Sequence, residues 1–176
     1  MTAGPTYTSI ASQILSSDAA SITFSSISGA YTDLVISASV LGKNVGAAGA
    51  NTQFLTFNGD TGANYSKTQM TGLSTSASSY TVLGASSMNL GNANEANSNT
   101  LDFSPQIYQI MNYANTTTYK SVLGRANDVL STSSRTAALI GLWSSTAAIT
   151  SITLSTDSSG GWYAGSTFSL YGIAAA

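Results

Sequence analysis

The chain has 176 residues, of which five are lysine or arginine and seven are aspartate or glutamate, with no histidine and no cysteine. Charged residues make up 7% of the chain, against about 25% in typical soluble domains. The missing residue types exclude histidine acid–base catalysis near neutral pH, thiolate chemistry and disulfide bonds. The surface that remains is rich in serine and threonine and repels its neighbours only weakly, which favours a subunit of an assembly.

The length and the hydrophobic content of 43% predict one packed domain over residues 1–176. The first residues, Met1 to Thr6, have neither the basic nor the apolar segment of a secretion signal. No apolar run approaches the roughly 18 residues of a membrane helix, and the scattered lysines and arginines form no basic patch. We therefore expect assembly in the cytoplasm, with neither nucleic acid nor a membrane as partner.

Alternation of apolar and polar residues is the main local pattern. Within residues 31–41, Leu34, Ile36 and Ala38 share one face, and Asp33 and Ser37 share the other, as in a half-buried strand. Turn-forming clusters separate such segments and predict an all-β fold, an antiparallel, jelly-roll-like β-sandwich of roughly nine to twelve strands with little or no helix. Thirteen segments are candidates for these strands: 6–10, 21–24, 31–41, 52–58, 65–73, 80–83, 86–90, 100–103, 107–112, 119–125, 137–143, 149–155 and 167–173.

Three segments depart from this pattern. Residues 9–15 are the best candidate for a short helical turn. Residues 74–79, rich in serine, are expected to form a loop. Pro105 lies between two strand-like runs and lacks a backbone N–H, so it predicts a bulge or an edge position.

The sequence Asp60-Thr61-Gly62-Ala63 matches the catalytic loop of aspartic proteases. That chemistry needs two carboxylates that share a proton, whereas the Asn58-Gly59 pair directly before Asp60 is typical of a tight hairpin turn. Asn58, Asp60 and Asn64 also offer oxygen ligands to a calcium ion, but hard cations prefer several carboxylates. We favour the turn, and we expect neither a metal nor a cofactor.

The other acidic residues are isolated from one another in the sequence. They do not form the carboxylate pair that glycoside hydrolysis needs. Serines are numerous, but no histidine exists to activate one as a nucleophile. We do not expect an enzyme.

Two aromatic residues, Trp162 and Tyr163, follow Gly160-Gly161 in a predicted loop. Exposed aromatic side chains on loops are typical anchors of interfaces. We therefore expect Trp162 and Tyr163 to contact a partner.

The N-terminal arm, about residues 1–8, is the second predicted contact. Pro5 stiffens this segment, and an extended arm can add a strand to the sheet of a neighbour. We expect Thr2, Pro5 and Tyr7 to take part in this contact.

Four stretches are spread over nearly the whole chain: residues 24–35 (FSSISGAYTDLV), 57–66 (FNGDTGANYS), 141–154 (GLWSSTAAITSITL) and 165–173 (GSTFSLYGI). In this order they resemble a class of small virion proteins of tailed bacteriophages. The resemblance implies a β-sandwich component of the capsid exterior or of the tail. The class often has an arginine near the end of the Tyr-Thr-Asp-Leu strand, where this chain has Leu41-Gly42-Lys43.

On this resemblance we expect a virion structural protein, first of all a capsid decoration (cement) protein. It would bridge subunits of the major capsid protein through many weak contacts, as a homo-oligomer and by our estimate a homotrimer. The alternative is a tail-tip or tail-fibre module that binds a host surface glycan through Trp162, Tyr163 and residues 92–99.

Overall fold

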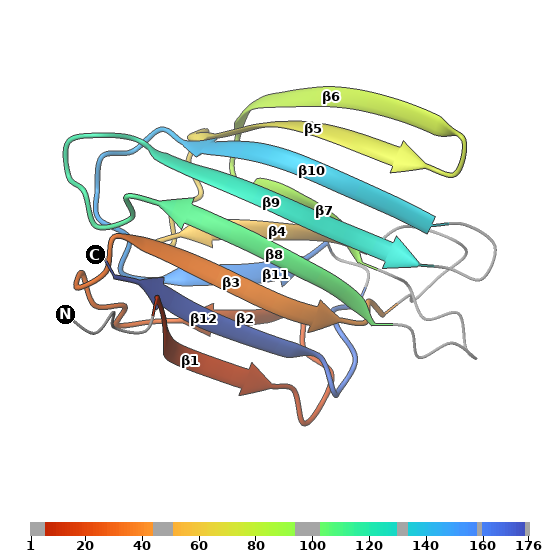
Figure 1. Ribbon diagram of the computed structural model, residues 1–176, viewed down its shortest axis with the longest axis horizontal. Helices are drawn as coiled ribbons and strands as arrows, with labels where there is room; N and C mark the ends of the chain where they lie inside the picture. Colours follow the sequence, from red (N-terminus) through yellow and green to blue (C-terminus); the bar gives the residue numbers. More distant parts are fainter. Residues whose placement is uncertain (1–5, 44–50, 94–102, 130–133, 158–159, 175–176) are drawn as a thin grey trace.

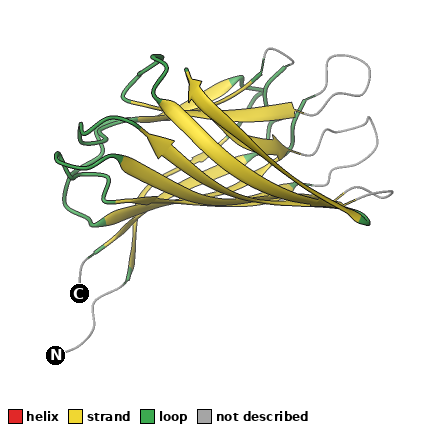
Figure 2. Cartoon of the chain, turned by 90° about the horizontal axis from the view of Figure 1, so that it is seen from above, coloured by secondary structure: helices red, strands yellow, loops and turns green. Residues whose placement is uncertain are grey.

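The computed structural model describes residues 6–43, 51–93, 103–129, 134–157 and 160–174. Across these ranges the chain forms twelve β-strands and no helix, and hence no helix that could cross a lipid bilayer. The strands pair antiparallel in two sheets that pack against each other (Figures 1 and 2). The predicted all-β sandwich is therefore confirmed.

The two sheets differ in size, with eight strands in one and four in the other. The larger sheet has the order β1 (Tyr7–Ile14), β12 (Thr167–Ile173), β3 (Asp33–Val40), β8 (Ser104–Met111), β9 (Lys120–Val129), β10 (Ser134–Trp143), β5 (Tyr65–Leu73) and β6 (Ser76–Ala85). The smaller sheet has the order β2 (Ser21–Phe24), β11 (Ile152–Thr156), β4 (Asn51–Phe57) and β7 (Met88–Ala93).

Alternating residues of each strand build the core between the sheets. Leu34 and Ile36 of β3 face the same interior as Leu55 and Phe57 of β4, and all four are fully buried. The burial pattern of β12 alternates along its whole length. The period-2 pattern of the sequence therefore identifies the residues that hold the sheets together.

Two strand glycines lie under large side chains. A Cβ at Gly124 would lie 2.5 Å from the ring of Tyr108, its cross-strand neighbour on β8, and a Cβ at Gly141 would lie 2.2 Å from the sulfur of Met88. Tyr108 and Met88 are each only 1% exposed. The missing side chains leave the space that these two residues fill.

The structure corrects three local predictions. Residues 9–14 form no helical turn but continue β1, because pairing with β12 along the whole strand outweighs local preference. Residues 76–79 belong to β6, and the turn is confined to the two residues before it, with Ser74 at φ 51°. Pro105 lies in the internal strand β8 rather than at an edge or bulge, and it is tolerated there because pairing with β9 begins only at Gln106.

Most of the predicted strands are confirmed, and three of them, residues 21–24, 65–73 and 167–173, have the predicted bounds. The expected strand 100–103 falls largely outside the described residues, and the strand of this region, β8, begins at Ser104.

Replacing Gly124 by alanine should destabilise the fold by about 1–3 kcal/mol, since the Tyr108 ring has no room to withdraw. The matched control is Gly72→Ala on β5, where a Cβ would make an ordinary contact of 3.6 Å with Thr136. This control should be neutral or stabilise by about 0.5 kcal/mol. Urea unfolding followed by tryptophan fluorescence measures both, and equal effects of the two variants would contradict the packing argument.

Candidate interaction surface

The Asp-Thr-Gly motif is a structural turn. Asn58 and Gly59 have φ values of 53° and 68°, and the Asp60 N–H donates to the Phe57 carbonyl at 2.9 Å, which closes a tight turn. The Asp60 carboxylate accepts hydrogen bonds from Trp143 Nε1 at 2.7 Å, from the Gly62 N–H at 2.8 Å and from Asn64 Nδ2 at 2.9 Å. The Trp143 indole contributes most to holding the pKa of this carboxyl below its ordinary value. Both carboxylate oxygens of Asp60 are therefore used in hydrogen bonds that stabilise this turn.

The neighbouring Asn58 side chain connects this turn to the segment before β11. Its amide nitrogen donates to the Ala148 carbonyl at 2.8 Å, and its Oδ1 accepts from the backbone N–H groups of Thr150 and Ser151. Two loops far apart in the sequence are thus fixed to each other. In the described ranges, no group of three or more Asp, Glu, His or Cys residues is placed to hold a metal ion.

The prediction of an exposed Trp162 is wrong. Trp162 is fully buried and packs edge-on against Phe168, with ring centroids 4.9 Å apart. Its backbone N–H donates to the Ala19 carbonyl, and isolated bridges connect it to Ala19 and Gly42. The Gly-Gly pair that suggested a loop turns the chain inward instead: Gly161 has φ 89°, and a Cβ there would lie 2.3 Å from the Ala19 carbonyl oxygen.

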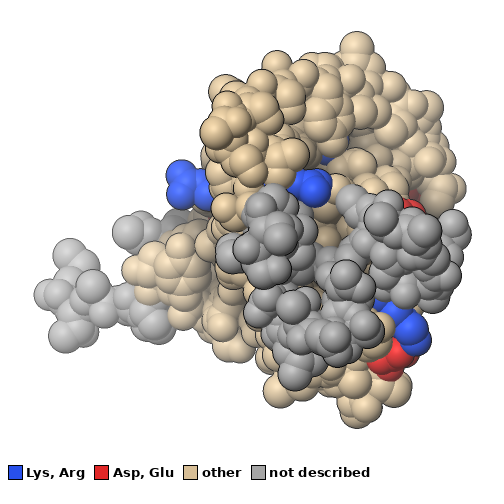
Figure 3. All heavy atoms as spheres, turned by 90° about the vertical axis from the view of Figure 1, so that its right-hand side faces the viewer, with Lys and Arg blue, Asp and Glu red and all other residues tan. Residues whose placement is uncertain are grey.

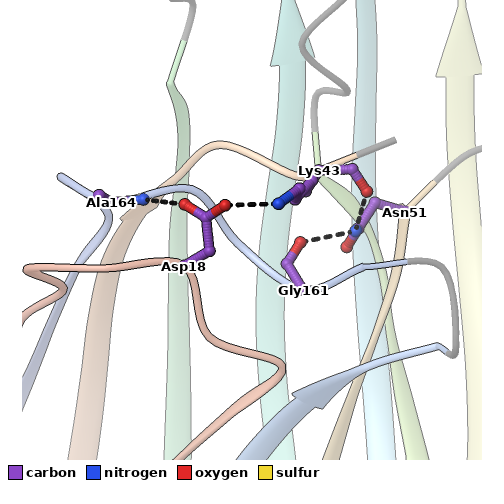
Figure 4. A network of polar contacts seen from close by, with 5 residues as sticks. All are labelled: Asp18, Lys43, Asn51, Gly161 and Ala164. Carbon is purple, nitrogen blue, oxygen red and sulfur yellow. Dashed lines mark hydrogen bonds and ion pairs between the residues drawn. The ribbon is translucent and has the colours of Figure 1, made fainter. Parts of the chain in front are cut away.

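Polar contacts hold this inserted segment in place (Figure 4). Lys43 Nζ lies 2.5 Å from a carboxylate oxygen of Asp18, whose other oxygen accepts from the Ala164 N–H at 3.1 Å. The amide of Asn51 donates to the Gly161 carbonyl at 3.0 Å. The hydrogen bond from Lys43 is the main cause that lowers the pKa of the Asp18 carboxyl.

Tyr163, the second predicted anchor, is partly exposed beside this network. Lys43 Nζ lies 5.6 Å from its ring centroid. Tyr7 lies in β1, is 55% exposed and packs edge-on against Tyr171. Thr2 and Pro5 lie outside the described residues. Among the three described residues, Tyr7 pairs with Ile173 at the end of β12, whereas Tyr163 lies before the start of β12 and Trp162 is buried. These three residues therefore do not form one surface site.

Inside the sandwich, Lys67 forms a polar cluster without a carboxylate among its described partners. Its ammonium donates to Gln69 Oε1, Tyr80 Oη and Asn89 Oδ1, each at 2.7 Å, and the residue is 3% exposed. Neutral oxygens replace only part of the hydration of a cation. Burial therefore lowers the pKa of Lys67 from 10.5 to about 8.

The outer face of the larger sheet carries a group of exposed apolar side chains. Leu123 on β9 lies directly opposite Ile140 on β10, and these two side chains are 42% and 53% exposed. We call this group the outer apolar patch. It consists of Met70, Ile107, Leu123, Ile140 and Leu142.

Few charges surround the outer apolar patch. In the part of the larger sheet whose side chains are described, Arg125, opposite Ile107, and Asp33, at the start of β3, are the charged residues on this face. Asp33 accepts hydrogen bonds from the Asn112 N–H and the Gln109 amide. On the end of the molecule drawn in Figure 3, the charged side chains of the described residues lie in separate small groups and form no single patch.

Sequence reasoning missed this patch, although β9 and β10 carry its signal. Both strands have adjacent apolar residues, such as Val122-Leu123 and Leu139-Ile140, so each strand is apolar on two faces. One residue of each pair fills the core, and the other is exposed. Contiguous apolar patches larger than a few hundred Å² are rare on monomeric proteins and mark interaction sites, whereas single exposed apolar residues are normal.

No protein-family model matches this chain, and no curated protein sequence matches it.

Replacing Trp162 by alanine should destabilise the fold by about 3–5 kcal/mol, because a fully buried indole leaves a cavity. The adjacent Tyr163→Ala should cost only about 0.5–1 kcal/mol, the value of an exposed contact between a cation and an aromatic ring. Thermal or chemical denaturation measures the difference. A stable, fully folded Trp162→Ala variant would contradict the buried position of this side chain.

Between pH 8 and 9, the free energy of unfolding should rise by about 0.5–1 kcal/mol. The range ends at pH 9 because burial raises the pKa of four tyrosines, whose ionisation nearer pH 10 favours the unfolded chain: Tyr65, Tyr80, Tyr108 and Tyr113. The unfolded chain keeps the Lys67 proton up to its ordinary pKa of 10.5, whereas the folded chain releases it near pH 8. Deprotonation thus favours the folded state, and the gain is less than the full shift because water screens the cluster beside the edge strand β6. Urea titrations at several pH values measure this rise.

The Lys67→Met variant should reduce the rise with pH. It should not abolish the rise, since burial also lowers the pKa of Lys120. Lys43→Met is the matched control: its hydrogen bond to Asp18 raises the pKa of Lys43, so it stays protonated in both states over this range. If both methionine variants keep the full rise, Lys67 is not its source.

Proposed function

We propose that this protein is a structural component of a bacteriophage virion, most specifically a capsid decoration (cement) protein. The outer apolar patch carries the proposal. Its five apolar side chains lie on a broad sheet face whose other residues are mainly serine and threonine, with few charges to desolvate. A surface of this kind can be buried against a shell without leaving unpaired charges behind.

The mechanism that we infer is mechanical. Each copy places its outer face over a joint between subunits of the major capsid protein, and many moderate contacts act together around the shell. The sandwich suits this task because two packed sheets resist deformation. The sequence resemblance to virion proteins of tailed bacteriophages supports the same assignment.

The N-terminal arm has a smaller part in this proposal than its sequence suggested. Tyr7 and Thr8 pair with Ile173 and Gly172 in the larger sheet, so they are part of the folded domain. A contact by the arm would therefore use residues before Thr6. A deletion that tests the arm must end before β1.

The alternative of a glycan-binding tail module is not favoured by the geometry. Its main aromatic platform needs Trp162 on the surface, and Trp162 is buried. Asn92 lies in β7, and residues 94–99 fall outside the described ranges. We therefore retain the decoration protein as the proposed function.

The test has two steps, beginning with the number of copies per virion relative to the major capsid protein, measured by quantitative mass spectrometry. A number comparable with the capsid protein is expected. A handful of copies would instead assign the protein to the tail, and absence from the virion would overturn the proposal.

The second step measures binding to particles assembled without the protein. The double variant Leu123→Lys and Ile140→Lys should bind at least about tenfold more weakly, which corresponds to roughly 1.4 kcal/mol. The matched control is Thr23→Lys with Thr153→Lys, a cross-strand pair on the outer side of the smaller sheet. Equal binding by both double variants would exclude the outer apolar patch as the contact surface.

A further inference from the structure

Strand β1 forms one edge of the larger sheet. It pairs with β12 on one side, and on the other side no described strand pairs with it. Edge strands of natural proteins are usually protected by charged residues, proline, β-bulges or short length. The eight residues of β1, YTSIASQI, include no charge and no proline, but one β-bulge interrupts the strand. This edge can accept another strand if the bulge is compatible with that pairing.

A β-bulge in β1 changes which residues share a face. The register with β12 shifts between Ser9 and Ala11, so that Ile10 is the extra residue. Before the bulge, Tyr7 and Ser9 lie opposite Ile173 and Tyr171. After it, the residues opposite Ser169 and Thr167 are Ser12 and Ile14.

The four partners on β12 are alternate residues, so they point to one face of the sheet. Tyr7, Ser9, Ser12 and Ile14 therefore share the outer face. In a regular strand, Tyr7 and Ile14 would lie on opposite faces because seven positions separate them. Because of the bulge, outward-facing residues occur at matching distances on both sides of the centre of β1, as a two-fold axis requires.

We propose that two copies of this chain pair through β1, antiparallel and about a two-fold axis. In this register Tyr7 lies opposite the partner's Ile14, and Ser9 lies opposite the partner's Ser12. Residues directly opposite in an antiparallel pair point to the same face of the sheet. The bulge puts both members of each of these pairs on the outer face, so the register is allowed. The interface is isologous, as in most closed dimers.

The exposed side chains of β1 fit this register. Tyr7 is 55% exposed and Ile14 is 70% exposed, and these are the large apolar residues at the two ends of the strand. Antiparallel pairing about the two-fold axis places Tyr7 of each copy against Ile14 of the other copy. A pair of an aromatic and a β-branched residue is among the favourable cross-strand pairs. Ser9 and Ser12 form a small, uncharged pair near the axis.

A groove beside β1 supports the pairing of a second strand with this edge. It has a volume of about 320 Å³ and lies between β1 and β2, the edge strands of the two sheets. Its apolar lining includes Ile10, Ala11, Phe24, Ile27 and Leu170. The partner's β1 would run along the open side of this groove and shield these residues from water.

The opposite edge of the larger sheet is less suited to the same contact. Like β1, strand β6 has a register shift against its partner, here between Tyr65 and Lys67 of β5, so a bulge alone does not distinguish the two edges. No comparable two-fold match of exposed apolar residues occurs along β6, whose sequence is SASSYTVLGA. We therefore assign the contact to β1 alone, which gives dimers instead of the trimer expected from the sequence.

Cysteine cross-linking tests the register. The chain has no cysteine of its own, and residues 7 and 14 of one copy lie about 20 Å apart along the strand, too far for a disulfide within one chain. The double variant Tyr7→Cys with Ile14→Cys should form a covalent dimer under mild oxidation. Peptide mapping should find position 7 of one copy joined to position 14 of the other.

The control for cross-linking is Tyr7→Cys with Gln13→Cys. Gln13 lies opposite Phe168, so it points to the inner face and should not join position 7 of the other copy. Cross-links between equal positions, or equal yields from both double variants, would overturn the two-fold register.

Charge substitutions at the centre of the interface give an independent test. Ser9→Lys with Ser12→Lys places like charges opposite each other in both symmetry-related pairs, and the dimer should dissociate. Ser9→Lys with Ser12→Glu places opposite charges there, and the dimer should persist. Sedimentation equilibrium of the purified chain measures both. A wild-type chain that is monomeric across the micromolar range, or two variants with equal dissociation constants, would contradict the proposal.

These tests do not depend on the role in a virion. A dimer could form in a protein with another function, and a decoration protein could bind its shell as a monomer. Cross-linking and sedimentation use the isolated chain, whereas the proposed function is tested by copy number and by binding to particles. Failure of one proposal is thus distinguishable from failure of the other.

Discussion

The position of β12 determines the arrangement of the larger sheet. This last strand lies between β1 and β3, so it joins the first strand of the chain to the centre of the sheet through hydrogen bonds on both sides. Contacts between segments so distant in sequence close the largest loops of the chain, which costs conformational entropy and slows folding. Because β12 occupies the inner place, β1 is the edge strand. The proposed contact between two copies follows from this topology.

Neutral groups form the hydrogen bonds to the two main charged centres of the fold, Asp60 and Lys67, since the chain has few charges to pair. The Asp60 carboxylate is satisfied by an indole, an amide and a backbone N–H, and the Lys67 ammonium by two amide oxygens and a phenol. Hydrogen bonds to charged groups are stronger than those between neutral groups. Without an ion pair to another described residue at either centre, the Asp60 centre thus fixes a turn, and the Lys67 centre connects β5, β6 and β7.

The sequence predicted the strands better than the surfaces. Alternation located β2, β5 and β12 within their observed bounds, because these strands bury one face and the pattern reports burial directly. It failed at residues 9–14, where pairing with β12 decides the structure, and at Trp162, where two glycines turn the chain into the core. The outer apolar patch also escaped prediction. Adjacent apolar residues in β9 and β10 indicate that each strand has two apolar faces. Only the pairing of the two strands, which local sequence does not specify, brings Leu123 next to Ile140.

The scarcity of charge on the outer face has a consequence for the conditions in which such a surface can work. Ionic contacts between exposed groups weaken as salt is added, since counterions screen them over about 10 Å at 0.1 M ionic strength. Apolar burial is not screened, and some salts strengthen it. A particle coated through such a face would keep its coat both in dilute water and in brine, where a coat attached through surface ion pairs would loosen.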